Sequence, residues 1–450
     1  MTTLRNRYVL LAILALGIAV PASAATITIV NVNAPGVGFN DPTPVAPVGG
    51  NPGTTFGQQA INAFQFAADV WGATLESDAE IFIQASFSPL NCTATAATLG
   101  AAGALQVFSN FPGSEYSDTW YHVALANKLA GGDLAPGPNG TNADDMVAFF
   151  NSRLGQPNCL PNQGWYFGFD TNHGTNIDLV TVLLHEFGHG LGFANFVNEQ
   201  TGSNTGPPFL TDIYSQYTID DTTGVSWSAM SNAQRQVSAL NSRNVSWTGL
   251  NVTASVPTTL AFGTPLVRIN APSSLAGVLA VGAAAFGPPL TSTGVTGNVV
   301  IGLDAADAAG PSTTDGCSPF ANAAAVAGNV ALVDRGTCGF VVKVKNAQNA
   351  GAVAVLVADN APGAPPAVLG GADPTIIIPS VRITLPAGNA IKAATGVNAT
   401  LIVDPTVRAG ANTVGRALLN APNPVQLGSS ISHMRDRPKA MRRAKRLRHR

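Results

Sequence analysis

The chain has 450 residues, of which 46% are hydrophobic and 11% are charged, and its formal net charge is −2. The apolar fraction is ample for a buried core, which argues against intrinsic disorder, and the length suits two or three domains. The charge is unevenly distributed, because residues 434–450 hold nine of the 23 Lys and Arg, whereas residues 25–433 carry 12 basic and 24 acidic side chains. The body of the chain is therefore acidic and its tail is strongly basic.

Residues 1–24 have the pattern of a signal peptide. Arg5 and Arg7 precede the apolar run YVLLAILALGIAV, and Ala-Ser-Ala at 22–24 fits a cleavage site. The run is short for a membrane span, although an uncleaved anchor is the alternative, and no later segment has the roughly 18 uninterrupted apolar residues of a membrane helix. We expect a soluble, secreted protein, extracellular or periplasmic, with no membrane contact after signal cleavage.

The chain contains four cysteines, Cys92, Cys159, Cys317 and Cys338. In an oxidising compartment an even number predicts two disulfides. Three pairings exist, and we favour Cys92–Cys159 with Cys317–Cys338 because each then stays inside one expected domain. Zinc binding by the cysteines is the rival interpretation, but no CxxC spacing supports it.

Alternating and helical patterns outline the first half of the chain. Residues 26–32 and 80–88 read as strands, and residues 57–75 place apolar side chains at helical spacing. The strand at 80–88 is either a cleft edge that pairs with a peptide substrate or an ordinary core strand. Residues 130–164 are expected to be a long loop. Residues 176–190 predict a helix that ends at glycines, with Asp178 as its cap.

This last helix contains His-Glu-Phe-Gly-His at 185–189, an HExxH motif. Positions i and i+4 share a helix face, so His185 and His189 are placed to hold one zinc ion. Glu186 is then the general base that takes a proton from the attacking water. A catalytic zinc site needs three protein ligands, and the compact form of the motif would put the third at Asn195, whose amide is a poor ligand.

Other histidines and carboxylates compete for the third position. His433, in SISHM, and Asp212, in FLTDIYSQY, are the two candidates. His122 follows Trp-Tyr in an expected helix and is interpreted as a core or surface residue. His173 precedes the motif helix in a loop and is interpreted as a residue near the substrate.

The composition changes after about residue 258. Residues 259–405 are rich in small and β-branched side chains, and NVALVDRG and AVAVLVADN read as buried strands on either side of the helical FVVKVKNAQNAGA. This block is expected to be an α/β unit that is distinct from the region before it.

Two resemblances narrow the interpretation. The motif region resembles the leishmanolysin-like branch of the metzincin zinc peptidases, in which a long segment that can hold a whole domain separates the second histidine from a third in a Ser-His sequence. Residues 259–405 resemble a protease-associated (PA) domain, on GCSPF, IIIPSVRIT and the strand–helix–strand stretch. The resemblance implies an α+β fold: a zincin-like metallopeptidase domain at 25–258, interrupted by the α/β PA insert and resumed at 406–433, where His433 becomes the third ligand.

The chain departs from the leishmanolysin pattern after His433. A tryptophan and a methionine turn would follow in that family, whereas this chain has Met434 and a run of arginines. We expect residues 434–450 to be a non-native or disordered tail from a truncated or frameshifted gene, and hence no nucleic-acid partner. A genuine nucleic-acid or surface-binding tail is the alternative.

The expected function is that of a secreted zinc endopeptidase acting on a protein or peptide substrate. Zn²⁺ would be held by His185, His189 and His433, with Glu186 as base. One alternative is a catalytically impaired secreted binding protein that uses its PA domain for protein–protein interaction. Another is an α/β binding protein with an accidental motif. The sequence leaves the oligomeric state open.

Overall fold

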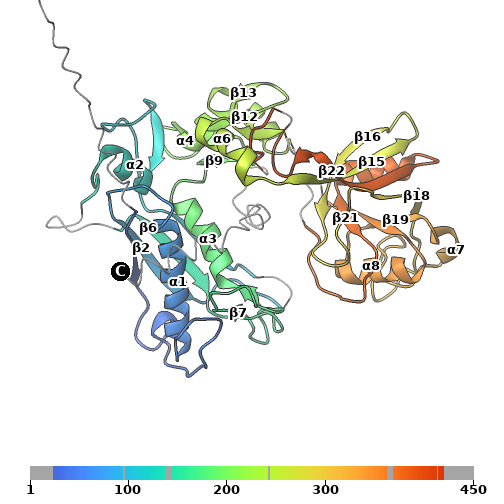
Figure 1. Ribbon diagram of the computed structural model, residues 1–450, viewed down its shortest axis with the longest axis horizontal. Helices are drawn as coiled ribbons and strands as arrows, with labels where there is room; N and C mark the ends of the chain where they lie inside the picture. The colour runs from blue at the N-terminus through green and yellow to red at the C-terminus, as the bar shows by residue number, and fades with distance from the viewer. Residues whose placement is uncertain are drawn as a thin grey trace, which may run out of the picture.

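The computed structural model describes residues 24–94, 97–136, 144–241, 244–361, 368–412 and 414–419, which form two lobes (Figure 1). The expected signal peptide, except its last residue, lies outside these residues, as do His433 and the basic tail. Within the described ranges, none of the helices has both the length and the apolar character that a membrane crossing requires.

The first lobe is built on a four-stranded sheet in the order β1-β2-β6-β3. Strands β1, β2 and β6 are parallel and β3 is antiparallel to β6. Helices α1 and α3 pack beside this sheet and against each other. The bounds are β1 Ile27–Asn31, α1 Phe56–Gly72, β2 Ile81–Ser88, β3 Gly100–Ala104, β6 Met146–Asn151 and α3 Leu179–Gly190.

The sequence predictions for β1, α1, β2 and α3 are confirmed. The predicted loop at 130–164 is wrong in its middle, because β6 lies there between β2 and β3. The six residues MVAFFN follow a polar Gly/Pro/Asn stretch and have no clear alternation, so their strand character comes from pairing on both sides.

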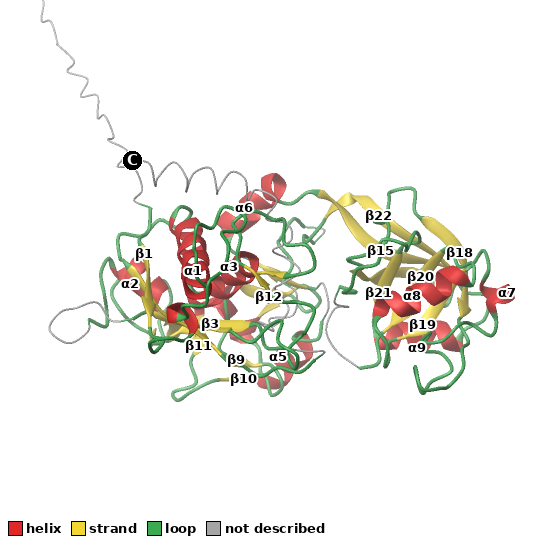
Figure 2. Cartoon of the chain, turned by 90° about the horizontal axis from the view of Figure 1, so that it is seen from below, coloured by secondary structure: helices red, strands yellow, loops and turns green. Residues whose placement is uncertain are grey.

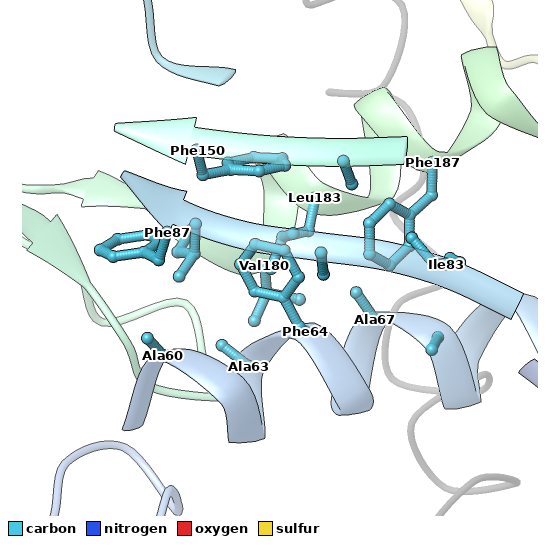
Figure 3. Packing of buried hydrophobic residues seen from close by; sticks show 14 of the residues in the cluster. Ala60, Ala63, Phe64, Ala67, Ile83, Phe87, Phe150, Val180, Leu183 and Phe187 are labelled. Atoms are coloured by element: carbon cyan, nitrogen blue, oxygen red, sulfur yellow. The ribbon is translucent and has the colours of Figure 1, made fainter. Parts of the chain in front are cut away.

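The core of this lobe fills the space between the sheet and the two helices. The close-up in Figure 3 shows Phe64 of α1 among side chains of both layers. Its ring lies edge-on to Phe150 at 5.0 Å and to Phe187 at 6.0 Å between centroids. Small residues at Ala60, Ala63 and Ala67, all fully buried, let α1 lie close to the strands.

Truncating Phe64 tests this packing. Phe64 has an exposed fraction of 0%, so Phe64→Ala should lower the free energy of unfolding by about 3–5 kcal/mol, since the cavity and the lost transfer energy add. Chemical denaturation measures the change. Phe209→Ala is the matched control because that ring is 63% exposed, and it should change stability by less than about 0.5 kcal/mol. Equal effects of the two substitutions would contradict the assigned core.

Short elements complete the first lobe, and three small sheets, β11-β5-β4, β13-β12-β14 and β7-β8, lie among them with the hairpin β9-β10. Their bounds are η1 Gly38–Asn40, β4 Val107–Phe108, β5 Thr119–His122, α2 Val123–Ala130, β7 Trp165–Tyr166, β8 Ile177–Asp178, β9 Val197–Asn198, β10 Ser203–Asn204, β11 Thr211–Asp212, α4 Ile213–Tyr217, β12 Thr218–Asp220, β13 Val225–Ser226, η3 Trp227–Ala229, α5 Asn232–Ser238, β14 Val245–Trp247 and α6 Leu250–Thr259.

The second lobe contains an eight-stranded sheet in the order β16-β15-β22-β18-β19-β20-β21-β17. Strands β18 to β21 are parallel, and side chains from successive residues of β19 enter two different apolar clusters, one with α9 and one with α8. The bounds are β15 Phe262–Ala271, β16 Gly277–Ala280, β17 Gly282–Ala283, β18 Val295–Ile301, α7 Ala323–Val326, β19 Val330–Asp334, α8 Phe340–Asn349, β20 Ala354–Ala358, β21 Ser380–Ile383, α9 Leu385–Ala393 and β22 Asn398–Arg408.

The predicted strand–helix–strand unit is confirmed as β19-α8-β20, with β19 and β20 parallel. Both predicted disulfides are also confirmed. Cys92 pairs with Cys159 in the first lobe, and Cys317 pairs with Cys338 in the second.

Two paired strands connect the lobes (Figure 2). The chain leaves the first lobe through α6 and β15 and comes back through β22, and Phe262 of β15 pairs with Arg408 of β22. Past β22, Leu418 bridges Ser246, and the Trp247 N–H donates to the Ala417 carbonyl at 2.9 Å. The segment 410–419 therefore becomes part of the first lobe.

Candidate metal and catalytic site

Helix α3 carries the HExxH motif and is fixed at its start and along one side. The Asp178 carboxylate accepts the Thr181 N–H at 3.2 Å, which caps the helix as predicted. Leu183 and Phe187 are fully buried in the core. The Trp71 indole N–H donates to the Leu184 carbonyl at 3.0 Å, which joins α1 to α3 one residue before the first motif histidine.

The two motif histidines meet on one side of α3. Their Nε2 atoms are 3.2 Å apart, and the ring planes are inclined at 88°. Two nitrogen ligands of a tetrahedral zinc ion, each about 2.0–2.1 Å from the metal, are separated by roughly 3.3 Å. The spacing of His185 Nε2 and His189 Nε2 is that of a hydrogen bond between the two rings, and it also fits a shared metal ion.

The turn after α3 sets the orientation of the second histidine. His189 Nδ1 lies 2.9 Å from the Phe193 carbonyl oxygen, so the ring donates there when Nδ1 carries its proton. That tautomer leaves the lone pair on Nε2, as a metal ligand requires. Gly192 makes the turn with φ +121°, a conformation that other residues adopt only with strain.

The Glu186 carboxylate lies beside the pair and beside the sheet edge. Its Oε1 is 4.0 Å from His185 Nε2. Burial raises the pKa of Glu186 to about 7, against the opposing effect of a hydrogen bond from the Ala102 backbone. Ala102 belongs to β3, the last strand of the sheet order. A carboxyl group with a raised pKa next to two histidines is the arrangement that general-base chemistry uses.

The edge strand next to the motif is β3 and not the predicted candidate. The strand at 80–88 is β2, which pairs with β1 on one side and β6 on the other, so of its two interpretations the core strand holds. Sequence reasoning missed β3 because its residues, GAAGA, have neither alternation nor bulky side chains. The only sequence signal was a small-residue run after a Cys-containing loop.

The third metal ligand is not found in the described part of the chain. His433 lies outside it, and among the described residues no three His, Cys, Asp or Glu side chains gather closely enough to hold a metal ion. Asp212, the alternative third ligand, therefore does not lie close enough to His185 and His189 to form a three-ligand site with them. Its carboxylate accepts the Ser215 N–H at 2.7 Å and the Phe196 N–H at 2.9 Å, which makes it the cap of α4.

The remaining histidines have other surroundings. His122 was expected in a helix but is the last residue of β5. Its ring is buried and stacks on Phe196 at 4.5 Å between centroids. Burial and, secondarily, the charge of His189 lower the pKa of His122 to about 4. His173 is half-buried, with Nδ1 at 2.7 Å from the Asn176 carbonyl oxygen.

Aromatic side chains connect the site to the returning segment. The Phe193 ring, 40% exposed, contacts Tyr214 edge-on at 5.1 Å, and Tyr214 contacts Trp247 at 5.0 Å between centroids. Leu419, near the end of the returning segment, packs in the same cluster as Tyr214. Leu419 thus shares a cluster with Tyr214, and Tyr214 contacts Phe193, whose carbonyl oxygen faces His189.

Comparison with known proteins identifies the second lobe. Residues 295–391 match the PA domain family. The chain is 35% identical over 144 residues to vacuolar-sorting receptor 2 of Arabidopsis thaliana, covering 28% of this chain and 22% of the receptor. It is 38% identical over 86 residues to human ER degradation-enhancing alpha-mannosidase-like protein 3, covering 19% and 8%. The chain therefore spans only a small part of the length of either relative.

Solved structures of peptidases are also similar over part of the chain. A zinc aminopeptidase from Bacillus subtilis is 21% identical and aligns with 34% of this chain and 36% of its own, at a TM-score of 0.23. An aminopeptidase from Aneurinibacillus sp. strain AM-1 is 26% identical, with 32% and 31% covered and a TM-score of 0.24. From its own helices and strands the protein is a mixed α/β chain, and the family match makes residues 295–391 a PA domain.

Proposed function

We propose that the chain is an exported zinc endopeptidase of the leishmanolysin-like kind. The observation that carries the proposal is the 3.2 Å separation of His185 Nε2 and His189 Nε2, on a helix that also presents the Glu186 carboxyl group. A zinc ion held there would polarise the scissile carbonyl and lower the pKa of a water molecule. Two disulfides are typical of an exported protein, which agrees with the expected signal peptide.

Glu186 acts as the general base in this proposal. Its partly buried carboxyl group has a raised pKa, and a base with a pKa near the working pH accepts a proton from the attacking water efficiently. The hydrogen bond from Ala102 fixes the carboxyl group against β3. A peptide substrate that pairs with β3 would lie next to the same group, since an edge strand offers backbone donors and acceptors.

His433 is the proposed third ligand. The returning segment reaches Leu419, which packs with Tyr214 close to the turn after α3. His433 lies fourteen positions after Leu419, and an extended chain of that length spans up to roughly 46–50 Å. This length supports the proposal of His433 as the ligand, and Asp212, engaged as a helix cap, is the weaker candidate.

Removing His433 tests the ligand set. In the full chain, wild type should bind about one zinc ion. His433→Ala should weaken zinc binding at least about tenfold, because the site loses one of its three protein ligands. Competition with a zinc-sensitive dye measures the affinity, and casein cleavage is followed in parallel. His173→Ala, which removes a half-buried histidine in the loop before α3, is the control and should match wild type. Unchanged zinc affinity in His433→Ala would reject His433 as a ligand.

The second candidate is a secreted binding protein without catalytic activity. The match to a sorting receptor over 144 residues favours it, because a receptor binds other proteins. In that case the PA domain carries the interaction and the metal site is incomplete. Wild-type chain that holds no zinc and cleaves no casein at any tested pH would favour this function over the peptidase.

A further inference from the structure

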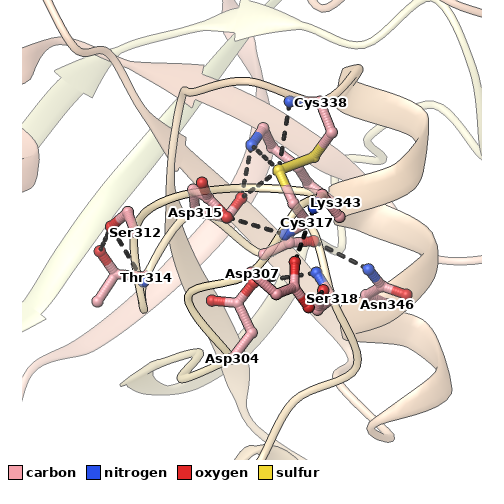
Figure 4. Close-up of a disulfide and its surroundings, with 12 residues drawn as sticks. Asp304, Asp307, Ser312, Thr314, Asp315, Cys317, Ser318, Cys338, Lys343 and Asn346 are labelled. Carbon is pink, nitrogen blue, oxygen red and sulfur yellow. Dashed lines mark hydrogen bonds between the residues drawn. A yellow bond between two sulfur atoms is a disulfide. The ribbon is translucent and has the colours of Figure 1, made fainter.

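The disulfide of the second lobe has a cationic neighbour. The Lys343 side chain is fully buried, and its Nζ donates to the Asp315 carbonyl oxygen at 2.6 Å and lies 3.3 Å from Cys317 Sγ (Figure 4). The Cys338 N–H also donates to Cys317 Sγ, at 3.3 Å. One sulfur of the pair thus accepts two hydrogen bonds, one of them from an ammonium group.

The two sulfurs also differ in access to solvent. Cys317 is buried, whereas Cys338 is partly exposed between the exposed residues Thr337 and Gly339. Nothing lies within 4 Å of the position that a Cβ would take on Gly339, so the space beside this turn is open. An incoming molecule meets Cys338 first, and the hydrogen-bond donors face Cys317.

The surrounding carboxylates accept hydrogen bonds from groups other than Lys343, and Asp304 Oδ1 and Asp315 Oδ2 are buried without a hydrogen-bond partner among the described residues. Asp315 accepts the Cys317 N–H at 3.1 Å, Asp304 accepts the Ser318 N–H at 3.0 Å, and Asp307 accepts the Ser318 hydroxyl. Burial lowers the pKa of Lys343, and the charges of Asp315, Asp304 and Asp334 oppose that effect. The carboxylates therefore help to keep Lys343 protonated. The two nearer contacts of Cys317 Sγ, Lys343 Nζ and the Cys338 N–H at 3.3 Å, are donors, and the Asp315 carbonyl oxygen lies farther away at 4.0 Å.

We propose that Cys338 is a site of thiol–disulfide exchange with a small-molecule thiol, with Cys317 as the leaving group. A thiolate attacks Cys338 Sγ and forms a new disulfide with it. The bond between Cys338 and Cys317 breaks, and its electron pair leaves as the Cys317 thiolate, which the Lys343 ammonium and the Cys338 N–H stabilise. Exchange is faster when the leaving thiolate is stabilised, and nearby cations stabilise thiolates.

The first-lobe disulfide provides an internal control. Cys159 is buried and Cys92 is partly exposed, the same pattern of access as in Cys317 and Cys338. The contact recorded for Cys159 Sγ is a neutral amide, Asn151 Nδ2, at 3.9 Å. The two disulfides therefore differ mainly in the charge of the donor beside the buried sulfur.

The test treats the folded full chain with glutathione, blocks free thiols with iodoacetamide and maps both modifications by mass spectrometry. We expect glutathione on Cys338, the alkyl group on Cys317, and opening of this disulfide at least about tenfold faster than that of Cys92–Cys159. Glutathione on Cys317, or equal opening rates of the two disulfides, would overturn the proposal.

Substitution of the lysine gives a second measurement. Lys343→Met should slow the exchange at Cys338 by about tenfold, because the leaving thiolate loses its ammonium partner. Lys345→Met is the matched control, since Lys345 lies on the same helix but its Nζ contacts Thr375 at the surface. An unchanged rate in Lys343→Met would reject the role of the lysine. If that variant fails to fold, the proposal is decided by whether glutathione is found on Cys338 or on Cys317 in the wild-type chain.

Discussion

Glu186→Gln is expected to lower kcat for peptide hydrolysis by roughly 10²–10⁴-fold, the range in which general bases contribute. The substitution keeps the size of the side chain and an oxygen that accepts the Ala102 N–H, but an amide does not take up a proton near neutral pH. His185 and His189 are unchanged, so zinc content should remain that of wild type. Steady-state kinetics with a fluorogenic peptide, alongside metal analysis of the same sample, measures both quantities.

Glu199→Gln is the control for this substitution. Burial raises the pKa of Glu199 to about 7, as it does for Glu186, but Glu199 is hydrogen-bonded to Asn195 beyond the motif helix. The variant should retain kcat within about threefold of wild type. Full activity in Glu186→Gln would remove the general base from the proposal. Equal losses in both variants would point to a general effect of charge on the fold.

His189→Ala is expected to abolish zinc binding at the site and peptide hydrolysis with it. The imidazole is 5% exposed, is oriented by the Phe193 carbonyl and supplies one of the two close Nε2 atoms. Its removal breaks the pair, and zinc affinity should fall by at least about 10²-fold. Metal analysis after dialysis against a weak chelator measures the loss. A chelator should also lower the Tm of wild type but not that of the variant.

His122→Phe is the control for His189→Ala, because it changes a nearby histidine that is not a proposed zinc ligand. The His122 ring stacks on Phe196 and is buried, so a phenyl ring preserves the contact. This variant should keep the zinc affinity of wild type, because His122 does not join His185 and His189 in a group of metal-binding geometry within the described residues. One zinc ion per chain in His189→Ala would contradict the proposed site.

The elements with a strong local pattern could be predicted from the sequence. Helix α3 has a side-chain cap at Asp178 and a continuous buried face, and β2 alternates buried and half-buried residues along its length. The strand–helix–strand unit around α8 and both disulfides followed in the same way. For the helix and strands residues close in sequence determine the outcome, whereas the disulfides, with sequence separations of 67 and 21, were predicted from keeping each pair inside one domain.

Elements defined by distant partners could not be predicted. Strand β3 consists of Gly and Ala and exists because it pairs with β6. The position of Ala102 beside Glu186 depends on that pairing. The engagement of Asp212 by the backbone of Phe196 and Ser215 was likewise invisible in the sequence, because a carboxylate that caps a short helix looks like a free ligand until its neighbours are placed.

The bridge between Ser246 and Leu418 has a consequence for biogenesis. The residues that bridge to β14 are synthesised only after the whole second lobe has been synthesised. A long unfolded segment between them would add an entropic cost to closure that grows slowly with its length. Folding of the second lobe brings β15 and β22 together and so shortens the effective loop. Folding of the second lobe therefore favours the bridge that joins residue 418 to the first lobe.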